Sequence, residues 1–552
     1  MKTKYMHVAL AVAAGILVAT CGSSDGRRDA TSSSSEYDYA PDREVKRFPR
    51  QTKPGVLVYK DASHEEEMRP GPADDAVIIH NTESYDRVYE NEFLRPAQNP
   101  LSTFAADVDT ASYSIVRRFL NRGQLPPPGA VRIEELVNYF NYQYAPPSDD
   151  KPFAVHTEAS RSPWNEKHVL LKIGIKGKVI PTEDTGPRNL VFLLDVSGSM
   201  ETPDKLPLLK KAMRMLTSQM NTKDRVAIVV YAGASGLVLP PTAGNNQAAI
   251  MAALERLQAG GSTNGGAGIQ LAYQTARQNF HQEGVNRVVL ATDGDFNVGT
   301  TNQSELVRLI EKERESGIFL TVLGFGSGNY KDSTMEKLAD KGNGNYAYID
   351  TIAEARKVLV QQIGATLVTI AKDVKLQVEF NPAQVQSYRL IGYENRMLKA
   401  EDFNDDKKDA GEIGAGHTVT ALYEIVPSGV QSDLGGTIDP LRYQQNNQLS
   451  GAASNGELAT VKIRYKDPAG STSKLLQVPV QQTVLELKDC SADMRMASAA
   501  AAYGMLLRGS SHKGQADYRL VRDLARSALQ NDPHGYRAEF LRLAEMAGDL
   551  QQ

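Results

Sequence analysis

The sequence predicts an α/β protein: a doubly wound, mostly parallel-sheet domain inserted into an antiparallel β domain, with helical segments near both ends. Strand and helix patterns alternate through residues 188–370, as a parallel sheet covered by helices on both faces requires. Segments that alternate polar and apolar residues lie on both sides, at 151–187 and 371–485, and this pattern is typical of half-buried strands. Helical spacing of apolar residues marks the segments 101–150 and 486–552.

The length and composition indicate several ordinary globular domains. A single core stops growing at ~250–300 residues, and the chain has 552. The apolar fraction is 41%, the charged fraction is 23% and the net charge is only −4. Basic residues are scattered along the chain, so we expect no nucleic-acid-binding surface.

The first 20 residues have the pattern of a secretory signal peptide. Lys2 and Lys4 precede an apolar run over residues 6–19. This run is shorter than the ~20 residues that a membrane-spanning helix needs, which disfavours a permanent transmembrane anchor. We therefore expect export from the cytoplasm.

Cys21 follows this run and resembles the lipidated cysteine of a bacterial lipoprotein signal. The resemblance implies that Cys21 is acylated and ties the protein to a membrane of the cell envelope, facing the periplasm or the cell surface. Thr20 stands where Gly or Ala is more usual, so a soluble periplasmic form stays open. The other cysteine, Cys490, then has no intrachain disulfide partner.

Residues 21–100 are polar and irregular, and we expect a flexible tether, since such a composition buries too little apolar area to offset chain entropy. Within it, residues 77–79 and 85–93 are apolar enough to dock on the folded body. Two helices are predicted next, at 112–120 and 132–140, separated by three prolines at 126–128.

Strand patterns flank the central domain at 153–160 and 168–176 before it, and at 374–380, 387–393, 417–425, 458–465 and 475–480 after it. The alternative of two unrelated β pieces is less favoured, because two strands alone are marginally stable. After Cys490 the pattern predicts helices at 497–507, 518–530 and 539–550.

The central domain places polar residues directly after its predicted strands. Strands are expected at 189–194, 225–231, 287–292, 318–325 and 345–349, with helices between them and a last helix at 353–363. The first strand leads into Asp195-Val-Ser-Gly-Ser-Met200, a later loop contains Thr263, and the strand at 287–292 ends before Asp293. Parallel sheets of this kind bind ligands at the carboxyl ends of their strands.

These polar residues form a candidate metal site made of oxygen ligands. Taken singly, Ser197 and Ser199 suit a helix N-cap and Asp293 suits a turn. Together they match a pattern of D-x-S-x-S, a threonine and an aspartate, supplied by one group of side chains: Asp195, Ser197, Ser199, Thr263 and Asp293. Hard oxygen ligands of this kind favour Mg²⁺ or Mn²⁺ over zinc.

The pattern resembles the metal-ion-dependent adhesion site of the von Willebrand factor type A (VWA) family. The resemblance implies that residues 188–370 form a VWA domain and that the ion keeps one coordination position for a carboxylate of a partner protein. The flanks, including Ser162-Pro-Trp164-Asn, resemble those of a bacterial group of envelope VWA proteins over residues 85–500.

Other motifs have simpler interpretations. The segment from Asp293 to Asn297 begins like an EF-hand loop, but Val298 stands where the glycine belongs. Asp295 either supports the metal ligands or is a solvated loop residue. The glycines at 324–328 predict a tight turn, and Asp107 and Asp109 predict helix capping rather than a second metal site.

The functional hypothesis is a non-enzymatic, metal-dependent protein-binding module of the bacterial cell envelope. Its partner is expected to be an envelope protein that presents an acidic residue. Two alternatives stay open: a structural scaffold with a stabilising ion and, less favoured, a metal-dependent hydrolase. The hydrolase is less favoured because no general base or nucleophile stands out beside the metal ligands.

Overall fold

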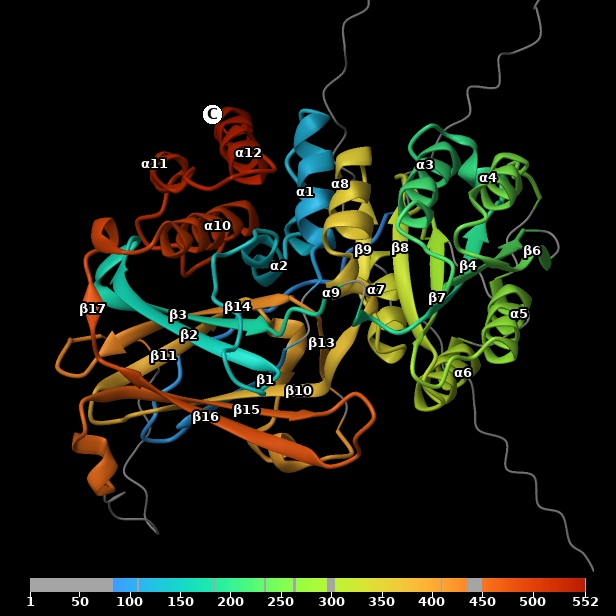
Figure 1. Cartoon of the computed structure of the whole chain (residues 1–552). Helices are drawn as coiled ribbons and strands as arrows, with labels where there is room; N and C mark the ends of the chain where they lie inside the picture. The colour runs from blue at the N-terminus through green and yellow to red at the C-terminus, as the bar shows by residue number, and fades with distance from the viewer. Residues whose placement is uncertain are drawn as a thin grey trace, which may run out of the picture. The chain divides into compact units, whose positions relative to one another are not determined.

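The computed structural model describes residues 83–106, 109–181, 184–232, 235–261, 265–294, 303–408, 410–432, 434 and 449–551 (Figure 1). The expected signal peptide, Cys21 and most of the expected tether lie outside these residues, as do Asp107, Thr263 and Asp295. All of the described residues belong to one unit, Val77–Gln552.

The central domain is built on a mixed six-stranded sheet in the order β6-β5-β4-β7-β8-β9. Every neighbouring pair is parallel except β5 and β6, which are antiparallel. The strands are β4 (Arg188–Asp195), β5 (Arg225–Tyr231), β6 (Ser235–Ala243), β7 (Val285–Thr292), β8 (Phe319–Phe325) and β9 (Tyr346–Ile349). The doubly wound arrangement predicted for this segment is confirmed.

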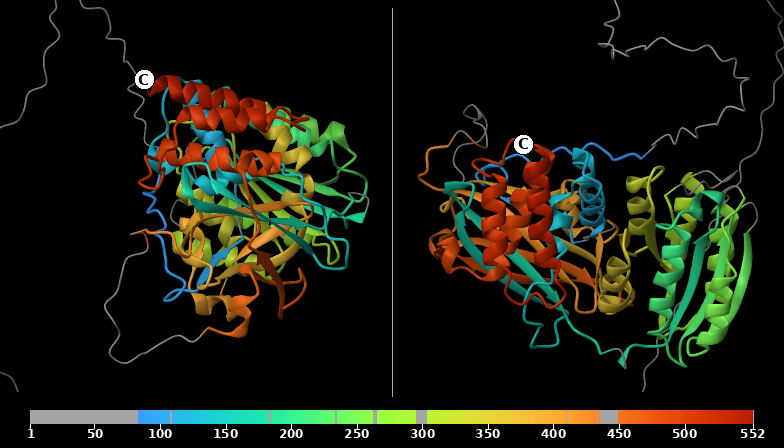
Figure 2. Two further views of the ribbon diagram at one scale, coloured as in Figure 1. Left: turned by 90° about the vertical axis from the view of Figure 1, so that its left-hand side faces the viewer. Right: turned by 90° about the horizontal axis from the view of Figure 1, so that it is seen from above.

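Helices cover both faces of this sheet (Figure 2). One face packs against α3 (Leu206–Thr217), α4 (Gln247–Glu255), α8 (Ile352–Arg356), a π-helical stretch (Lys357–Gln361) and α9 (Ile363–Leu367). The other face packs against α5 (Gly265–Gln278), α6 (Gln303–Glu315) and α7 (Asp332–Lys341). Alternate residues of β4, such as Phe192 and Leu193, enter the two different cores.

The β domain consists of two sheets that share one apolar core. The first has the order β11-β14-β3-β2-β17 and contains β11 (Val385–Ile391), β14 (Thr418–Pro427), β3 (Asn165–Gly177), β2 (Phe153–Ser162) and β17 (Val484–Leu485). The second has the order β12-β1-β10-β15-β16 and contains β12 (Met397–Leu398), β1 (Leu101–Ala105), β10 (Thr369–Phe380), β15 (Glu457–Lys466) and β16 (Ser473–Gln481). A short strand, β13 (Gly411–Gly414), also pairs with β10.

The chain leaves the β domain after β3 and returns to it at β10, so the central domain is inserted into the β domain as predicted. Two differences from the expected elements concern the start of the described chain. Residues 101–105 were expected within a helical segment but form β1, which is antiparallel to β10 over its full length. Residues 83–100 were expected within the flexible tether, but Leu94 forms a β-bridge with Tyr388. Phe93 is buried, in agreement with the docking expected for residues 85–93.

The two helical segments, far apart in sequence, form one layer with a common apolar core (Figures 1 and 2). The N-terminal segment supplies α1 (Ala111–Asn121) and α2 (Ile133–Asn138), and the C-terminal one supplies α10 (Ala492–Arg508), α11 (Tyr518–Ser527) and α12 (Tyr536–Leu550). The core of this layer also includes Leu170 and Leu422 of the first β sheet. Small side chains let α10 approach closely: a Cβ on Gly504 would lie 2.9 Å from Ile133 Cγ1.

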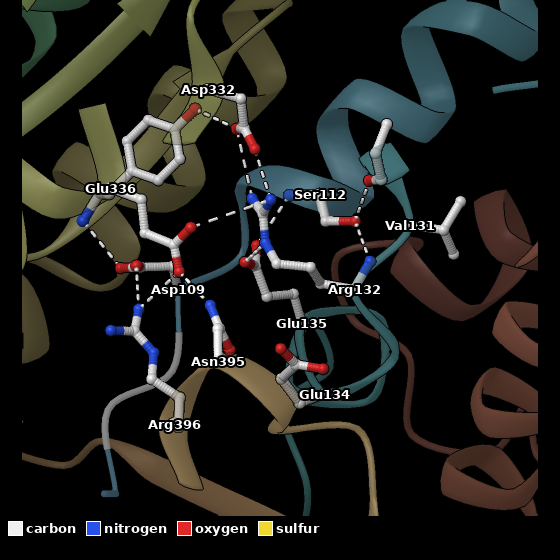
Figure 3. A network of polar contacts seen from close by, with 12 residues as sticks. Asp109, Ser112, Val131, Arg132, Glu134, Glu135, Asp332, Glu336, Asn395 and Arg396 are labelled. Carbon is white, nitrogen blue, oxygen red and sulfur yellow. Dashed lines mark hydrogen bonds and ion pairs between the residues drawn. The ribbon is translucent and has the colours of Figure 1, made fainter. Parts of the chain in front are cut away.

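A buried ion-pair network joins the central domain to the other parts (Figure 3). Arg132, just before α2, pairs with Glu135 and with Asp332 of α7. Arg396, just before β12, pairs with Glu336 of α7 at 3.0 Å and with Asp109 at 3.2 Å. The helix-capping interpretation of Asp109 is wrong, because its carboxylate instead accepts the Tyr346 backbone N–H at 2.8 Å and pairs with Arg396.

Candidate metal site at the carboxyl ends of two strands

The two acidic residues of the candidate metal site lie at the ends of neighbouring parallel strands. Asp195 is the last residue of β4, and Asp293 follows the last residue of β7. In the sheet, β5 lies on one side of β4 and β7 lies on the other. The order in which the chain adds strands to the sheet therefore reverses between β4 and β7. Both aspartates are fully buried.

Both carboxylate oxygens of Asp195 accept hydrogen bonds. Its Oδ1 accepts the Ser197 backbone N–H at 2.9 Å, and its Oδ2 accepts the hydroxyls of Tyr231 at 3.0 Å and Thr292 at 3.1 Å. Burial raises the pKa of Asp195 to about 6, although the hydrogen bonds from Ser197 favour the ionised form, and the charge of Asp293 adds to the rise. A bound cation would favour the ionised form of such a carboxyl.

The serines of the loop after β4 lie beside each other. The Oγ atoms of Ser197 and Ser199 are 3.0 Å apart, and Ser197 is buried whereas Ser199 is exposed. A second loop packs against this one, with Gly260 N–H donating to Val196 O at 2.8 Å and Gly198 N–H donating to Gly261 O at 3.1 Å. Thr263, two residues after Gly261, lies outside the described residues.

Asp293 has an ion-pair partner that the sequence did not indicate. The Lys205 Nζ donates to Asp293 Oδ2 at 2.9 Å, and the side-chain amide of Asn329 donates to the same oxygen at 3.3 Å. Lys205 also donates to Asn329 Oδ1 at 3.4 Å. No sequence motif identifies Lys205 as part of this site. It immediately precedes α3, and it contacts Asp293 only because folding brings the two residues together.

The turn after β8 brings Asn329 to this position. Gly326 and Gly328 have φ angles of +72° and +97°, which favour glycine, in agreement with the predicted tight turn. The structure thus brings together Asp195, Ser197, Ser199 and Asp293, with Lys205 and Asn329 as additional neighbours.

The donor set of these residues suits a small hard cation. Two carboxylates and two hydroxyls are oxygen ligands, and magnesium and manganese are held by such ligands in proteins. Within the part of the chain that the structure describes, no three His, Cys, Asp or Glu side chains gather closely enough to hold a metal ion. Hydroxyl donors are therefore needed alongside the two carboxylates if this site is to hold an ion.

The expected lipidation site is the remaining site predicted from the sequence. Cys21 lies outside the described residues. Across the described ranges, none of the helices combines the length and the apolar composition needed to cross a membrane.

Comparisons with known proteins cover most of the chain. A model described as "von Willebrand factor" matches residues 79–172, one described as "von Willebrand factor type A domain" matches residues 189–362, and one described as the C-terminal part of "Uncharacterized protein YfbK" matches residues 365–550. The Escherichia coli (strain K12) protein YfbK is 47% identical over 473 residues, which are 84% of this chain and 81% of the relative.

More distant similarities extend to other bacteria. The protein sll0103 of Synechocystis sp. is 24% identical over 317 residues, which are 57% of this chain and 70% of the relative. Among solved structures, a von Willebrand factor type A protein from Catenulispora acidiphila is 15% identical, with a TM-score of 0.36, and the match covers 81% of this chain and 90% of that one.

Proposed function

Because the chain belongs to the family of E. coli YfbK and contains a VWA domain, we propose that it is a metal-dependent protein-binding module of the bacterial cell envelope. A VWA domain by itself suggests protein interaction rather than catalysis. The observation that carries the metal-dependent part is the convergence of Asp195 and Asp293, two fully buried carboxylates, at the ends of neighbouring strands.

The ligands in this proposal are Asp195, Ser197, Ser199, Thr263 and Asp293, and the ion is Mg²⁺ or Mn²⁺. When bound, the ion supplies a positive centre that attracts an acidic group. Hydroxyl ligands bind the ion without adding charge, so it stays electrophilic toward an outside carboxylate. The resemblance to the adhesion site implies one coordination position for such a carboxylate, supplied by an envelope protein.

The non-enzymatic part of the proposal rests on how the acids are engaged. Both carboxylate oxygens of Asp195 already accept hydrogen bonds, and Asp293 pairs with Lys205. Groups engaged in this way are poorly suited to proton transfer with a substrate. We therefore assign these residues to binding.

The proposed location is the envelope, with the protein held to a membrane by a lipid on Cys21. The support is the sequence pattern of Lys2, Lys4 and the apolar run at 6–19. Replacement of Cys21 with serine should move the protein from the membrane fraction to the soluble fraction of broken cells. An unchanged membrane fraction would contradict the anchor.

The metal-binding proposal is tested by an Asp195→Asn variant. Mn²⁺ affinity, measured by electron paramagnetic resonance, should fall at least ~tenfold, because one of two charged ligands is lost. Asp204→Asn is the matched control: it removes the same charge from a side chain that is 39% exposed and hydrogen-bonded to Thr202. Equal Mn²⁺ binding by both variants would contradict the assignment of Asp195.

The partner-binding part is tested by crosslinking in cells. Envelope proteins crosslinked to the wild-type chain in Mg²⁺, but not after chelation and not with Asp195→Asn, are the expected partners. If crosslinking is unaffected while chelation strongly lowers the melting temperature, the ion is a structural one and the scaffold alternative holds.

A further inference from the structure

Lys205 places a fixed positive charge beside the proposed metal ligands. Its side chain is only 8% exposed, and its Nζ lies 2.9 Å from Asp293 Oδ2. Asn329 donates to the same oxygen, so Lys205 and Asn329 together hold one side of this carboxylate.

The geometry of the lysine stem indicates that this charge is held in place. Gly326 has a φ of +72°, and a Cβ there would lie 2.3 Å from both Cγ and Cε of Lys205. The stem thus lies directly on the Gly326 backbone, where only glycine leaves room. A long side chain packed in this way loses most of its alternative rotamers.

The turn that supports Lys205 is itself held in place by Glu83, Arg118 and Tyr348. Gly326 O accepts hydrogen bonds from Arg118 at 3.2 Å and from the Tyr348 hydroxyl. Gly328 N–H donates to Glu83 Oε1 at 2.7 Å, and Glu83 pairs with Arg118 at 2.7 Å. These contacts rigidify the turn, so the ammonium stays close to Asp293.

The charges of this arrangement determine when an ion binds well. Two carboxylates and one ammonium leave the site with a net charge of −1, and a divalent cation changes it to +1. One carboxylate from a ligand then brings the total to zero. Because such charges interact strongly where water is excluded, the ion and the carboxylate should each favour binding of the other.

From this we infer that Lys205 couples metal binding to ligand binding: it weakens the affinity for the ion alone and makes the ion bind tightly only together with an acidic ligand. This inference rests on the proposed metal-dependent function. It identifies Lys205 as the residue that tunes the site without being a ligand.

The test compares Lys205→Met with wild type, since methionine retains an unbranched stem for Gly326 and lacks the charge. Lys210→Met is the matched control, because Lys210 lies on α3, the helix that Lys205 immediately precedes, and donates instead to Leu257 O at 2.6 Å. Mn²⁺ affinity is measured in sodium chloride and in sodium acetate of equal ionic strength, with acetate as the carboxylate. Lys205→Gln provides a second neutral variant if the methionine variant does not fold.

Lys205→Met should bind Mn²⁺ in chloride at least ~tenfold more tightly than wild type. The gain in affinity that acetate gives should fall at least ~threefold in Lys205→Met and stay unchanged in Lys210→Met. Unchanged or weaker Mn²⁺ binding by the Lys205 variants, beside normal binding by wild type, overturns this inference alone. Absence of Asp195-dependent Mn²⁺ binding in wild type instead overturns the proposed function.

Discussion

At the residue scale, the proposed ligands were predictable and their neighbours were not. The D-x-S-x-S spacing in the loop after β4 identifies Asp195, Ser197 and Ser199. The position directly after a predicted strand identifies Asp293. Lys205 has no such pattern, because its contact with Asp293 spans 88 positions of sequence. Contacts of this kind arise from strand order, which local sequence does not encode.

Lys357 is another buried lysine with an unusual environment. Its Nζ lies 2.9 Å from the centre of the Tyr139 ring, and the side chain is fully buried. Burial lowers the pKa of Lys357 to about 7; the charges of Glu354 and Glu539 oppose this shift, and the charge of Arg117 adds to it. The lysine therefore changes charge in the folded state at a pH where it is still protonated in the unfolded chain.

The sign of the resulting pH dependence follows from linkage. Between pH ~7 and ~10.5 the unfolded chain binds more protons at Lys357 than the folded one, so stability rises with pH in this window. From pH 6 to pH 9 this group should add on the order of 2 kcal/mol to the free energy of unfolding. Lys357→Met should lack this contribution, as measured by urea unfolding, whereas Lys210→Met should retain it. Parallel pH profiles for wild type and Lys357→Met would refute the assignment.

At the element scale, strands in which polar and apolar residues alternate regularly were predictable. Strands without this pattern, which form only by pairing with a neighbouring strand, were not. The predicted strands before and after the central domain are confirmed as β2, β3, β10, β11, β14, β15 and β16. The edge strand β6 was missed because it contains Pro240 and Pro241, which sheets tolerate at an edge. The last helix of the central domain, predicted as continuous over 353–363, is divided into α8, the π-helical stretch and the start of α9.

The alanine-rich helix α10 illustrates why small side chains matter at this scale. It packs against α2, α11 and α12, and Ala500 is completely buried in the common core. Ala500→Leu should therefore lower the free energy of unfolding by ~1–3 kcal/mol, because a well-packed core has no space for the added methyl groups. Ala538→Leu on the exposed face of α12 is the control and should change stability by less than ~0.5 kcal/mol. A tolerated Ala500→Leu would show that the helical layer is loosely packed.

At the scale of the whole molecule, the sequence predicted the insertion of one domain into another but not how the parts are joined. The helical segments at the two ends were expected separately, and their packing into one layer depends on contacts such as the close approach of Gly504 in α10 to Ile133 in α2. The network around Arg132 and Arg396 likewise combines residues from positions 109–135, 332–340 and 395–396. In the sequence, none of these charged residues can be distinguished from an ordinary charged residue on the surface.

This network contains more acids than bases, so its stability should depend on pH. Burial raises the pKa of Glu135 to about 7 from an ordinary 4.5, although Arg132 opposes the shift, and burial also raises the pKa of Glu336. Between pH ~4.5 and ~7 the folded state therefore binds more protons at Glu135 than the unfolded chain. Stability from this group is greatest below pH ~4.5 and declines as the pH rises to ~7.

Arg132→Met should expose this excess of negative charge. Three carboxylates, those of Glu135, Asp332 and Glu336, would lose their shared cation in a buried site. At pH 8 we expect a loss of ~3–5 kcal/mol in the free energy of unfolding, because an unpaired buried charge is costly, and a clearly smaller loss at pH 5, where the carboxyls take up protons. Arg122→Met is the control, since Arg122 is 51% exposed and should contribute little. Urea unfolding at both pH values measures the difference; an equal loss at pH 5 and pH 8 would mean that Arg132 stabilises the junction by packing rather than by charge.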